Sequence, residues 1–428
     1  MIDVKIIRNN PELVRENLKR RNDPEKLNLL EEFIETDKKW RALLTQINDL
    51  RRKRNELSAQ IAKMKKESLV EPQLLKEADE VQTKITELST QLDEYGRKSQ
   101  SLLKRIPNLL HETVPYGHDE HDNVEIRRWG SPPKFNFQPK NHLELAINLG
   151  LVDEDRANKV AGTGFYYIKG ELALLDLAIQ RFAIDHLMKK GYTLVEPPFM
   201  LRREPYEGVT DLSDFETVMY KIENEDHYLI ATSEHPIAAM FMNETLDISE
   251  LPLKFVGVST NFRREIGAHG KYTKGFFRMH QFNKIEQFVF CLPEQSWGFH
   301  EELQHNCEEL YQMLGLHYRV VNVCTGDIGT VAAKKYDTEV WMADGVFREV
   351  GSNSNCTDYQ ARRLGIKYRE GAGKPPKDFV HTLNSTALAT SRTMMAILEQ
   401  YQQKDGTVII PEVLRPYMNG IKSLNKNR

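Results

Sequence analysis

Apolar side chains recur at alternating steps of four and three residues over two long stretches near the start of the chain, residues 29–64 and 74–106. This spacing is the heptad pattern of helices that pack along one seam. Pro72 stands between the stretches and cannot continue a helix, so the chain can reverse there. The pattern therefore predicts an antiparallel two-helix coiled-coil arm over about residues 29–106. The seam residues are Leu29, Phe33, Trp40, Leu43, Ile47, Leu50, Leu57, Ile61, Met64, Leu74, Ala78, Val81, Ile85, Leu88, Leu92, Tyr95, Leu102 and Ile106, with Thr36, Arg54 and Ser99 as imperfect members.

Charge is distributed unevenly over this arm. The outgoing limb from Lys38 to Lys66 is strongly basic, and the return limb from Glu67 to Tyr95 is strongly acidic. Pairing between the limbs accounts for part of this asymmetry. A basic stripe also suits the phosphate backbone of RNA. The arm alone leaves open an RNA-binding role and a protein-interaction role. The basic candidates for phosphate contacts are Arg51, Arg52, Lys53, Arg54, Lys63, Lys65 and Lys66.

The rest of the chain has a different pattern. After Ile106 it carries several prolines and glycines up to about Leu143, which indicates a linker and an entry strand. Beyond it, strands outnumber the helices between them, which favours an antiparallel sheet flanked by helices and an α+β fold. We expect two domains, residues 1–110 and 111–428. The expected helices are 171–190 and 386–402, and the expected strands are 192–195, 254–260, 281–290, 318–323 and 339–347.

Composition limits the classes of protein to which the chain can belong. The chain has 428 residues, 40% hydrophobic and 28% charged, with a net charge of −3. This describes a soluble globular protein in which any nucleic-acid surface must be local. No long apolar run or signal peptide is evident, so we expect a cytoplasmic protein without a membrane partner. The four cysteines are widely spaced and predict no zinc site.

The segment from Asn261 to Glu286 is the most informative part of the second domain. It predicts two antiparallel strands joined by a long loop, with Phe282 and Lys284 on one side of the second strand. Gln281, Asn283 and Ile285 fall on the other side. Arginine forks pair with phosphate oxygens, and an aromatic ring offers a platform for a base. The segment suits a nucleotide with a bound polar partner; the alternative is a surface hairpin with a charged face.

Several motifs in order give the chain a resemblance to a known family. It resembles the seryl-tRNA synthetases, which are class II aminoacyl-tRNA synthetases, over nearly its whole length. The residues of these motifs resemble those of the archaeal and eukaryotic cytosolic branch of the family. The motifs are Lys189-Lys190-Gly191-Tyr192 with Pro198, Thr232-Ser233-Glu234, Phe262-Arg263-Arg264-Glu265 through His280-Gln281-Phe282, Glu349-Val350-Gly351-Ser352, Ser354-Asn355-Cys356-Thr357-Asp358-Tyr359-Gln360-Ala361-Arg362-Arg363, and Asn384-Ser385-Thr386-Ala387-Leu388-Ala389-Thr390-Ser391-Arg392.

The resemblance implies ATP-dependent activation of L-serine followed by its transfer to tRNA. Implied catalytic residues are Arg263, Arg278 and Arg392. Implied ATP-binding residues are Arg263, Arg264, Glu265, Met279, Phe282, Glu349, Val350, Gly351, Ser352 and Arg392, with Glu349 and Ser352 as the Mg²⁺ ligands. Implied serine-binding residues are Thr232, Ser233, Glu234, Arg263, Glu286 and Thr386.

The resemblance also implies partners. The arm would grasp the long variable arm of tRNA(Ser), the catalytic domain would receive its acceptor end, and the motif around Gly191 and Pro198 would form a homodimer interface. The family also serylates tRNA(Sec) where the host has one. An alternative is a synthetase homologue that activates a small amino acid without charging tRNA. The loop departs from the family pattern at Ile266, Lys271, Tyr272 and Lys274.

Overall fold

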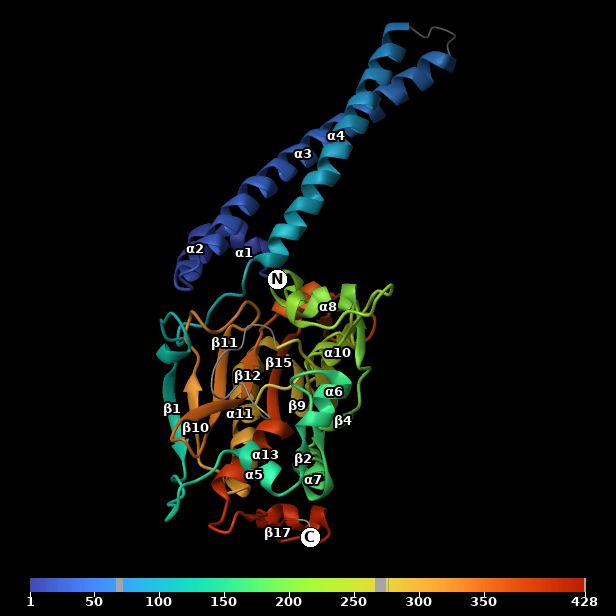
Figure 1. Ribbon diagram of the computed structural model, residues 1–428. Coiled ribbons are helices and arrows are strands. Elements are labelled where there is room, and N and C mark those ends of the chain that lie inside the picture. Colours follow the sequence, from blue (N-terminus) through green and yellow to red (C-terminus); the bar gives the residue numbers. More distant parts are fainter. Residues whose placement is uncertain (67–71, 266–274, 276, 427–428) are drawn as a thin grey trace. The chain divides into compact units, whose positions relative to one another are not determined.

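The computed structural model describes residues 1–66, 72–265, 275 and 277–426 (Figure 1). The chain forms two compact units, Met1–Pro107 and Asn108–Arg428, which are described separately below. Within these residues, no helix combines the length and the apolar character that crossing a membrane requires.

The first unit consists of four helices. They are α1 (Val4–Asn9), α2 (Pro11–Lys19), α3 (Pro24–Lys66) and α4 (Pro72–Arg105). The side chain of Asp3 accepts a hydrogen bond from the backbone N–H of Lys5, which caps α1. The buried carboxylate of Asp37 on α3 pairs with Arg8 of α1 at 2.6 Å. This ion pair ties the short helices to the base of the long ones.

The long helices α3 and α4 lie side by side as the predicted coiled coil (Figure 1). Leu57, Val81 and Ile85 form a buried cluster, with further seam residues packed against it. Lys53 on α3 pairs with Glu77 on α4 at 2.6 Å, so part of the charge asymmetry is cross-pairing. The reversal predicted before Pro72 lies outside the described residues. Pro72 itself opens α4, a position where a missing N–H costs no helical hydrogen bond.

The second unit is built around an eight-stranded sheet in the order β1-β10-β11-β12-β15-β9-β8-β4. Every neighbouring pair is antiparallel except β4 and β8, which run parallel. The predicted α+β class is therefore confirmed. The strand bounds are β1 Val124–Trp129, β4 Thr193–Val195, β8 Leu253–Phe262, β9 Gln281–Cys291, β10 Tyr318–Asn322, β11 Lys334–Trp341, β12 Phe347–Asn355 and β15 His381–Ala389.

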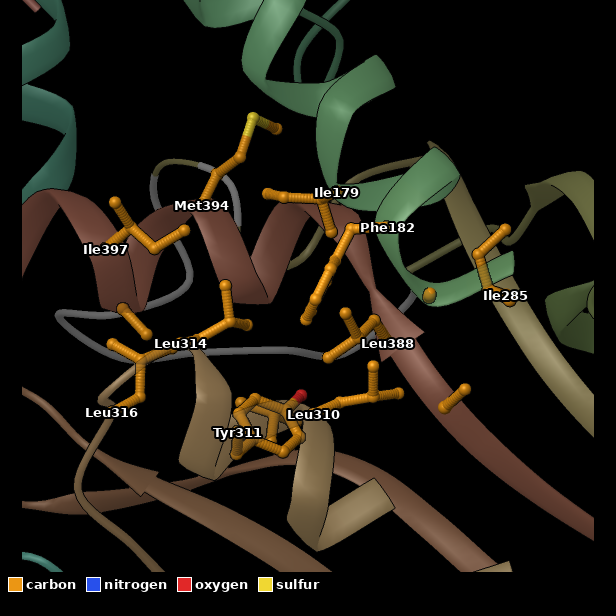
Figure 2. Packing of buried hydrophobic residues seen from close by; sticks show 14 of the residues in the cluster. Ile179, Phe182, Ile285, Leu310, Tyr311, Leu314, Leu316, Leu388, Met394 and Ile397 are labelled. Carbon is orange, nitrogen blue, oxygen red and sulfur yellow. The ribbon is translucent and has the colours of Figure 1, made fainter. Parts of the chain in front are cut away.

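Helices α7 (Gly170–Lys189), α11 (Ser296–Met313) and α13 (Thr390–Gln400) pack with this sheet in one core cluster. Figure 2 shows Phe182 of α7 beside Leu388 of β15, with Leu310 of α11 close by; Met394 and Ile397 of α13 belong to the same cluster. The shorter helices are α5 His142–Asn148, α6 Glu154–Ala161, α8 Arg203–Val209, α9 Leu212–Phe215, α10 Glu234–Ala238 and α12 Tyr359–Leu364. The core helices hold the central strands in place, and the site depends on those strands.

The predicted strand over 339–347 is wrong. β11 ends at Trp341, the chain turns through Asp344 and Gly345, and β12 begins at Phe347. Gly345 has a φ of +87°, a conformation that glycine adopts without steric cost. An Asp-Gly pair is a hairpin signal, and the apolar residues on both sides of it obscured that signal.

The predicted helix over 386–402 is wrong in its first part. Residues Thr386–Ala389 complete β15, and α13 begins at Thr390. β15 lies between β9 and β12 and is buried along its length after His381. A strand buried on both faces has no alternation of apolar and polar residues, so its pattern cannot be told from that of a buried helix.

Candidate active site

A cavity of about 360 Å³ in the second unit brings most of the predicted site residues together. Strands β9, β11, β12 and β15 and the first turn of α13 contribute to its walls. The predicted residues that line it are Thr232, Glu234, Arg263, Glu265, Met279, Phe282, Glu286, Glu349, Val350, Gly351, Ser352, Thr386 and Arg392.

Three of the residues predicted for catalysis or for binding ATP or serine do not line this cavity. Ser233 is fully buried beneath β8, where a Cβ added to Gly257 would lie 2.7 Å from its Oγ. Arg264 is exposed and its backbone N–H donates to the carbonyl of Val218. Arg278 is also exposed and pairs with Glu265 at 3.0 Å.

The hairpin of β8 and β9 orients one face of β9 toward the cavity. Phe282, Lys284 and Glu286 alternate onto this face, as predicted for the first two of them. Ile285 points into the core, and Gln281 and Asn283 line a separate hollow of about 340 Å³. The predicted antiparallel hairpin and its alternation are confirmed; the middle of its loop lies outside the described residues.

Arg263 stands just beyond the end of β8. Its Nε donates to the carbonyl of Ala231 at 3.2 Å, and its guanidinium carbon lies 5.4 Å from the centre of the Phe282 ring. The backbone N–H of Arg263 donates to the carbonyl of His280, which continues the hairpin past the strand. The guanidinium is therefore held at the cavity wall, where its planar fork suits phosphate or carboxylate oxygens.

Arg392 and Glu349 form a second charged group in the same cavity. Arg392 donates to the carbonyl of Glu349 at 2.9 Å, and its guanidinium lies 4.7 Å from the centre of the Phe277 ring. Burial raises the pKa of the Glu349 carboxyl, but Arg392 and Lys335 outweigh that effect, so its pKa lies below the ordinary value. Glu349 is consequently ionised at neutral pH.

Oxygen atoms gather around Glu349. The Ser352 hydroxyl donates to the Glu349 carboxylate at 3.3 Å. Asp337, the strand partner of Ser352 on β11, is buried and has one carboxylate oxygen without a hydrogen-bond partner. A carboxylate and a hydroxyl are the oxygen ligands that a hard divalent cation takes. The residues present therefore fit the predicted Mg²⁺ site.

Another part of the cavity holds a compact polar cluster. Lys284 pairs with Glu286 at 2.5 Å and donates to the Thr232 hydroxyl at 2.7 Å, while Thr232 donates to Glu286. Gln360 donates to Glu234 at 2.8 Å. Burial, with the charge of Glu286 adding to it, raises the pKa of Glu234 to about 7. Sequence reasoning missed Lys284 as a site residue, although Lys284 shares the cavity face of β9 with Phe282 and Glu286.

Comparisons with known proteins give matches in both units. The sequence pattern of the seryl-tRNA synthetase N-terminal domain matches residues 1–110. The pattern of the tRNA synthetase class II core domain (G, H, P, S and T) matches residues 217–401. A serine–tRNA ligase from Methanocella arvoryzae is 55% identical over 99% of this chain and 100% of that protein. This chain belongs to the seryl-tRNA synthetase family.

Solved structures of other members agree with this membership. The crystal structure of the Pyrococcus horikoshii seryl-tRNA synthetase complexed with ATP has a TM-score of 0.96 and 48% identity, and the match covers 100% of both chains. The cytoplasmic serine–tRNA ligase of Naegleria fowleri in complex with AMP has a TM-score of 0.86 and 40% identity, covering 98% of this chain and 96% of that one. The recognition made from the motifs is confirmed.

The tRNA-binding candidates of this seryl-tRNA synthetase family member lie on α3. They are exposed except Arg54, which is half-buried. Lys53 pairs with Glu77, and Arg52 lies 3.8 Å from Asp49. Among the described residues, no carboxylate forms an ion pair with Arg51, Lys63, Lys65 or Lys66. Cross-pairing therefore uses only part of the basic charge on this helix.

We expect Gly351→Ala to disrupt the cavity wall. A Cβ at this position would lie 2.7 Å from the Cβ of Thr386, a distance that forces one strand to move. Overpacking of this kind costs about 1–3 kcal/mol of unfolding free energy, which urea denaturation measures. Gly298→Ala in α11 is the matched control, since nothing lies within 4 Å of its added Cβ. Equal stability of the two variants would contradict the steric argument.

We expect Glu234→Gln to stabilise the protein more at pH 8 than at pH 5. The folded-state pKa of Glu234 is raised to about 7, so the native protein keeps a proton that the unfolded chain releases. This group therefore lowers stability as the pH rises from about 4.5 to about 7, by roughly 3 kcal/mol in total. Urea unfolding at both pH values measures the difference, and exposed Glu223→Gln is the control. A pH-independent difference between wild type and Glu234→Gln would contradict the assignment.

Proposed function

We propose that the protein is a serine–tRNA ligase that activates L-serine with ATP and transfers it to the 3′ end of tRNA(Ser). One observation carries the proposal. A single cavity joins two arginines, an ionised Glu349 and a polar cluster containing Glu234 and Glu286. This combination suits a triphosphate beside a small zwitterion. The near full-length similarity to proteins named serine–tRNA ligase supports the same choice.

In the first step, a serine carboxylate oxygen forms a bond to the α-phosphorus of ATP. The bond from that phosphorus to the bridging oxygen breaks, and pyrophosphate leaves with the electron pair. Negative charge grows around the α-phosphate, so fixed cations provide most of the catalysis. Arg263 contacts the serine carboxylate and the α-phosphate, and Arg278 and Arg392 take the outer phosphates.

Bound Mg²⁺ would neutralise phosphate charge during this step. Glu349 and Ser352 would hold it, because they supply the oxygen ligands described above. No zinc is part of the proposal.

The nucleotide base would stack on Phe282, with Met279 and Glu265 nearby on the cavity wall. Val350 and Gly351 complete this wall from β12. Arg264 contributes through its backbone position rather than its exposed side chain. Arg278 does not line the cavity but pairs with Glu265, which does, so a nucleotide that takes Arg278 must break or share that pair.

Serine would bind at the polar cluster. Glu234 and Glu286 hold its ammonium group and Thr386 its hydroxyl, while Thr232 and Ser233 support these residues from the segment directly before α10. A site that hydrogen-bonds the substrate hydroxyl rejects alanine strongly, because alanine leaves buried groups unpaired. The size of the cavity would reject threonine.

In the second step, the terminal ribose hydroxyl of tRNA attacks the acyl carbon and AMP leaves. Residues 1–110 would bind the long variable arm of tRNA(Ser) through the exposed basic residues of α3. Residues 111–428 would take the acceptor end and carry out the chemistry. tRNA(Sec) is a second substrate where the host has one, and the cytoplasm is the compartment of both reactions.

A homodimer is part of the proposal. Apolar side chains are exposed in the single chain on α7 and β4, the elements that the first motif contributes. Leu177, Met188 and Leu194 are 61%, 47% and 42% exposed. An apolar surface of this kind fits an interface with a second copy.

Serine-dependent exchange of pyrophosphate into ATP tests the activation step. We expect exchange with L-serine, at least tenfold less with L-threonine or L-alanine, and charging of tRNA(Ser). No exchange with serine would refute the proposal. Exchange without charging would favour the second candidate, a homologue that activates serine but does not charge tRNA.

Replacing Arg51, Arg52 and Arg54 by glutamine tests the arm. We expect charging of tRNA(Ser) to fall by about tenfold or more at moderate salt, because each lost phosphate contact weakens binding. Serine-dependent exchange should stay within about twofold of wild type. Replacing the exposed Lys76 and Lys84 on α4 by glutamine is the matched control. An equal loss in both variant sets would show that total charge, rather than these arginines of α3, matters.

A further inference from the structure

The polar cluster of Lys284, Thr232 and Glu286 contains a cation that the proposed reaction does not use. Lys284 lies on β9, is 7% exposed and lines the cavity. Taking a lysine ammonium out of water is costly, and burial accordingly lowers the pKa of Lys284. A buried ammonium group is stable only where charged or polar partners compensate for its lost hydration.

Thr232 links Lys284 to Glu286 through its hydroxyl group. The Thr232 hydroxyl donates its single proton to Glu286. Its oxygen accepts from the Lys284 ammonium at 2.7 Å and from the backbone N–H of Glu234 at 3.2 Å. A hydroxyl has one donor and two acceptor lone pairs, so this one is fully used. In this arrangement every donor and acceptor position of the Thr232 hydroxyl has a partner within the protein.

The same bonds divide the two oxygens of Glu286. Lys284 and Thr232 both bind Oε2. Within the described part of the chain, no hydrogen bond reaches Oε1. Glu286 lines the cavity, so Oε1 is the atom of this carboxylate that remains for a bound ligand. The orientation of the carboxylate depends on the two bonds to its other oxygen.

We infer that Lys284 is a positioning residue for the amino-acid substrate: it fixes Glu286 and Thr232 so that Glu286 Oε1 faces the substrate ammonium. This inference rests on the proposed function. Charge balance supports it. Glu234, Glu286, Arg263 and Lys284 line the same cavity, and Lys284 is the cation in direct contact with the Glu286 carboxylate.

Lys284→Met tests the inference, because methionine keeps the length of the side chain and removes the ammonium. Steady-state pyrophosphate exchange gives the KM values for serine and ATP and kcat. We expect the serine KM to rise about 10- to 100-fold, with the ATP KM within about twofold of wild type. Lys284→Arg keeps the charge and should recover part of the serine KM.

Lys254→Met is the matched control. Lys254 lies on the adjacent strand β8, pairs with Glu302 at 3.1 Å and does not line the cavity. We expect its KM values to stay within about twofold of wild type, since its ion pair supports the fold and not the ligand.

Thr232→Val is a second test of the role inferred for Lys284. It should raise the serine KM, and its effect should not add to that of Lys284→Met, because both break one cluster. If Lys284→Met does not fold, Thr232→Val against Thr232→Ser decides: an unchanged serine KM in the valine variant overturns the inference.

A folded Lys284→Met with serine KM within about twofold of wild type would overturn the inference. Equal increases in the serine and ATP KM values would also overturn it, because they indicate a general structural effect. A wild-type protein without serine-dependent exchange would instead refute the proposed function. The two failures are therefore distinguishable.

Discussion

The pairing of β9 with β8 and β15 is the constraint on which the site depends. Glu286 lies opposite Gly257 on one side and Thr386 on the other. A register shift after Thr386 adds one residue to β15, so Thr386 faces Glu286 while Leu388 faces Ile285. A bulge of this kind redirects a side chain without ending the strand. Without the bulge, Thr386 and Leu388 would point to the same face of the sheet. Thr386 could then not line the cavity while Leu388 packs in the core.

Gly257 matters for the same reason. A Cβ there would lie 2.6 Å from Ile237 and 2.7 Å from the Ser233 hydroxyl. The bare backbone of this strand lets α10 approach closely, and α10 begins at Glu234. The position of the Glu234 carboxylate therefore follows from a missing side chain on a neighbouring strand.

Sequence reasoning succeeded where a pattern is local. The heptads of the arm and the alternation around Phe282 and Lys284 predicted the coiled coil and the hairpin, because each reflects one buried face. It failed where burial removes the pattern, as at the start of the predicted helix at Thr386. The cavity gathered most of the site residues taken from the motifs, while the role of Lys284 depends on a partner 52 residues away, at Thr232. No spacing rule in a single sequence carries that information.

The heptad seam of α3 and α4 allows the length of the arm to change. The buried contacts along α3 and α4 repeat with each heptad, and the cavity lies in the other compact unit. Inserting one heptad into each helix would keep every seam residue in register and lengthen the hairpin by about 10.5 Å. Natural selection can therefore change the reach of this protein in discrete steps and leave its chemistry untouched.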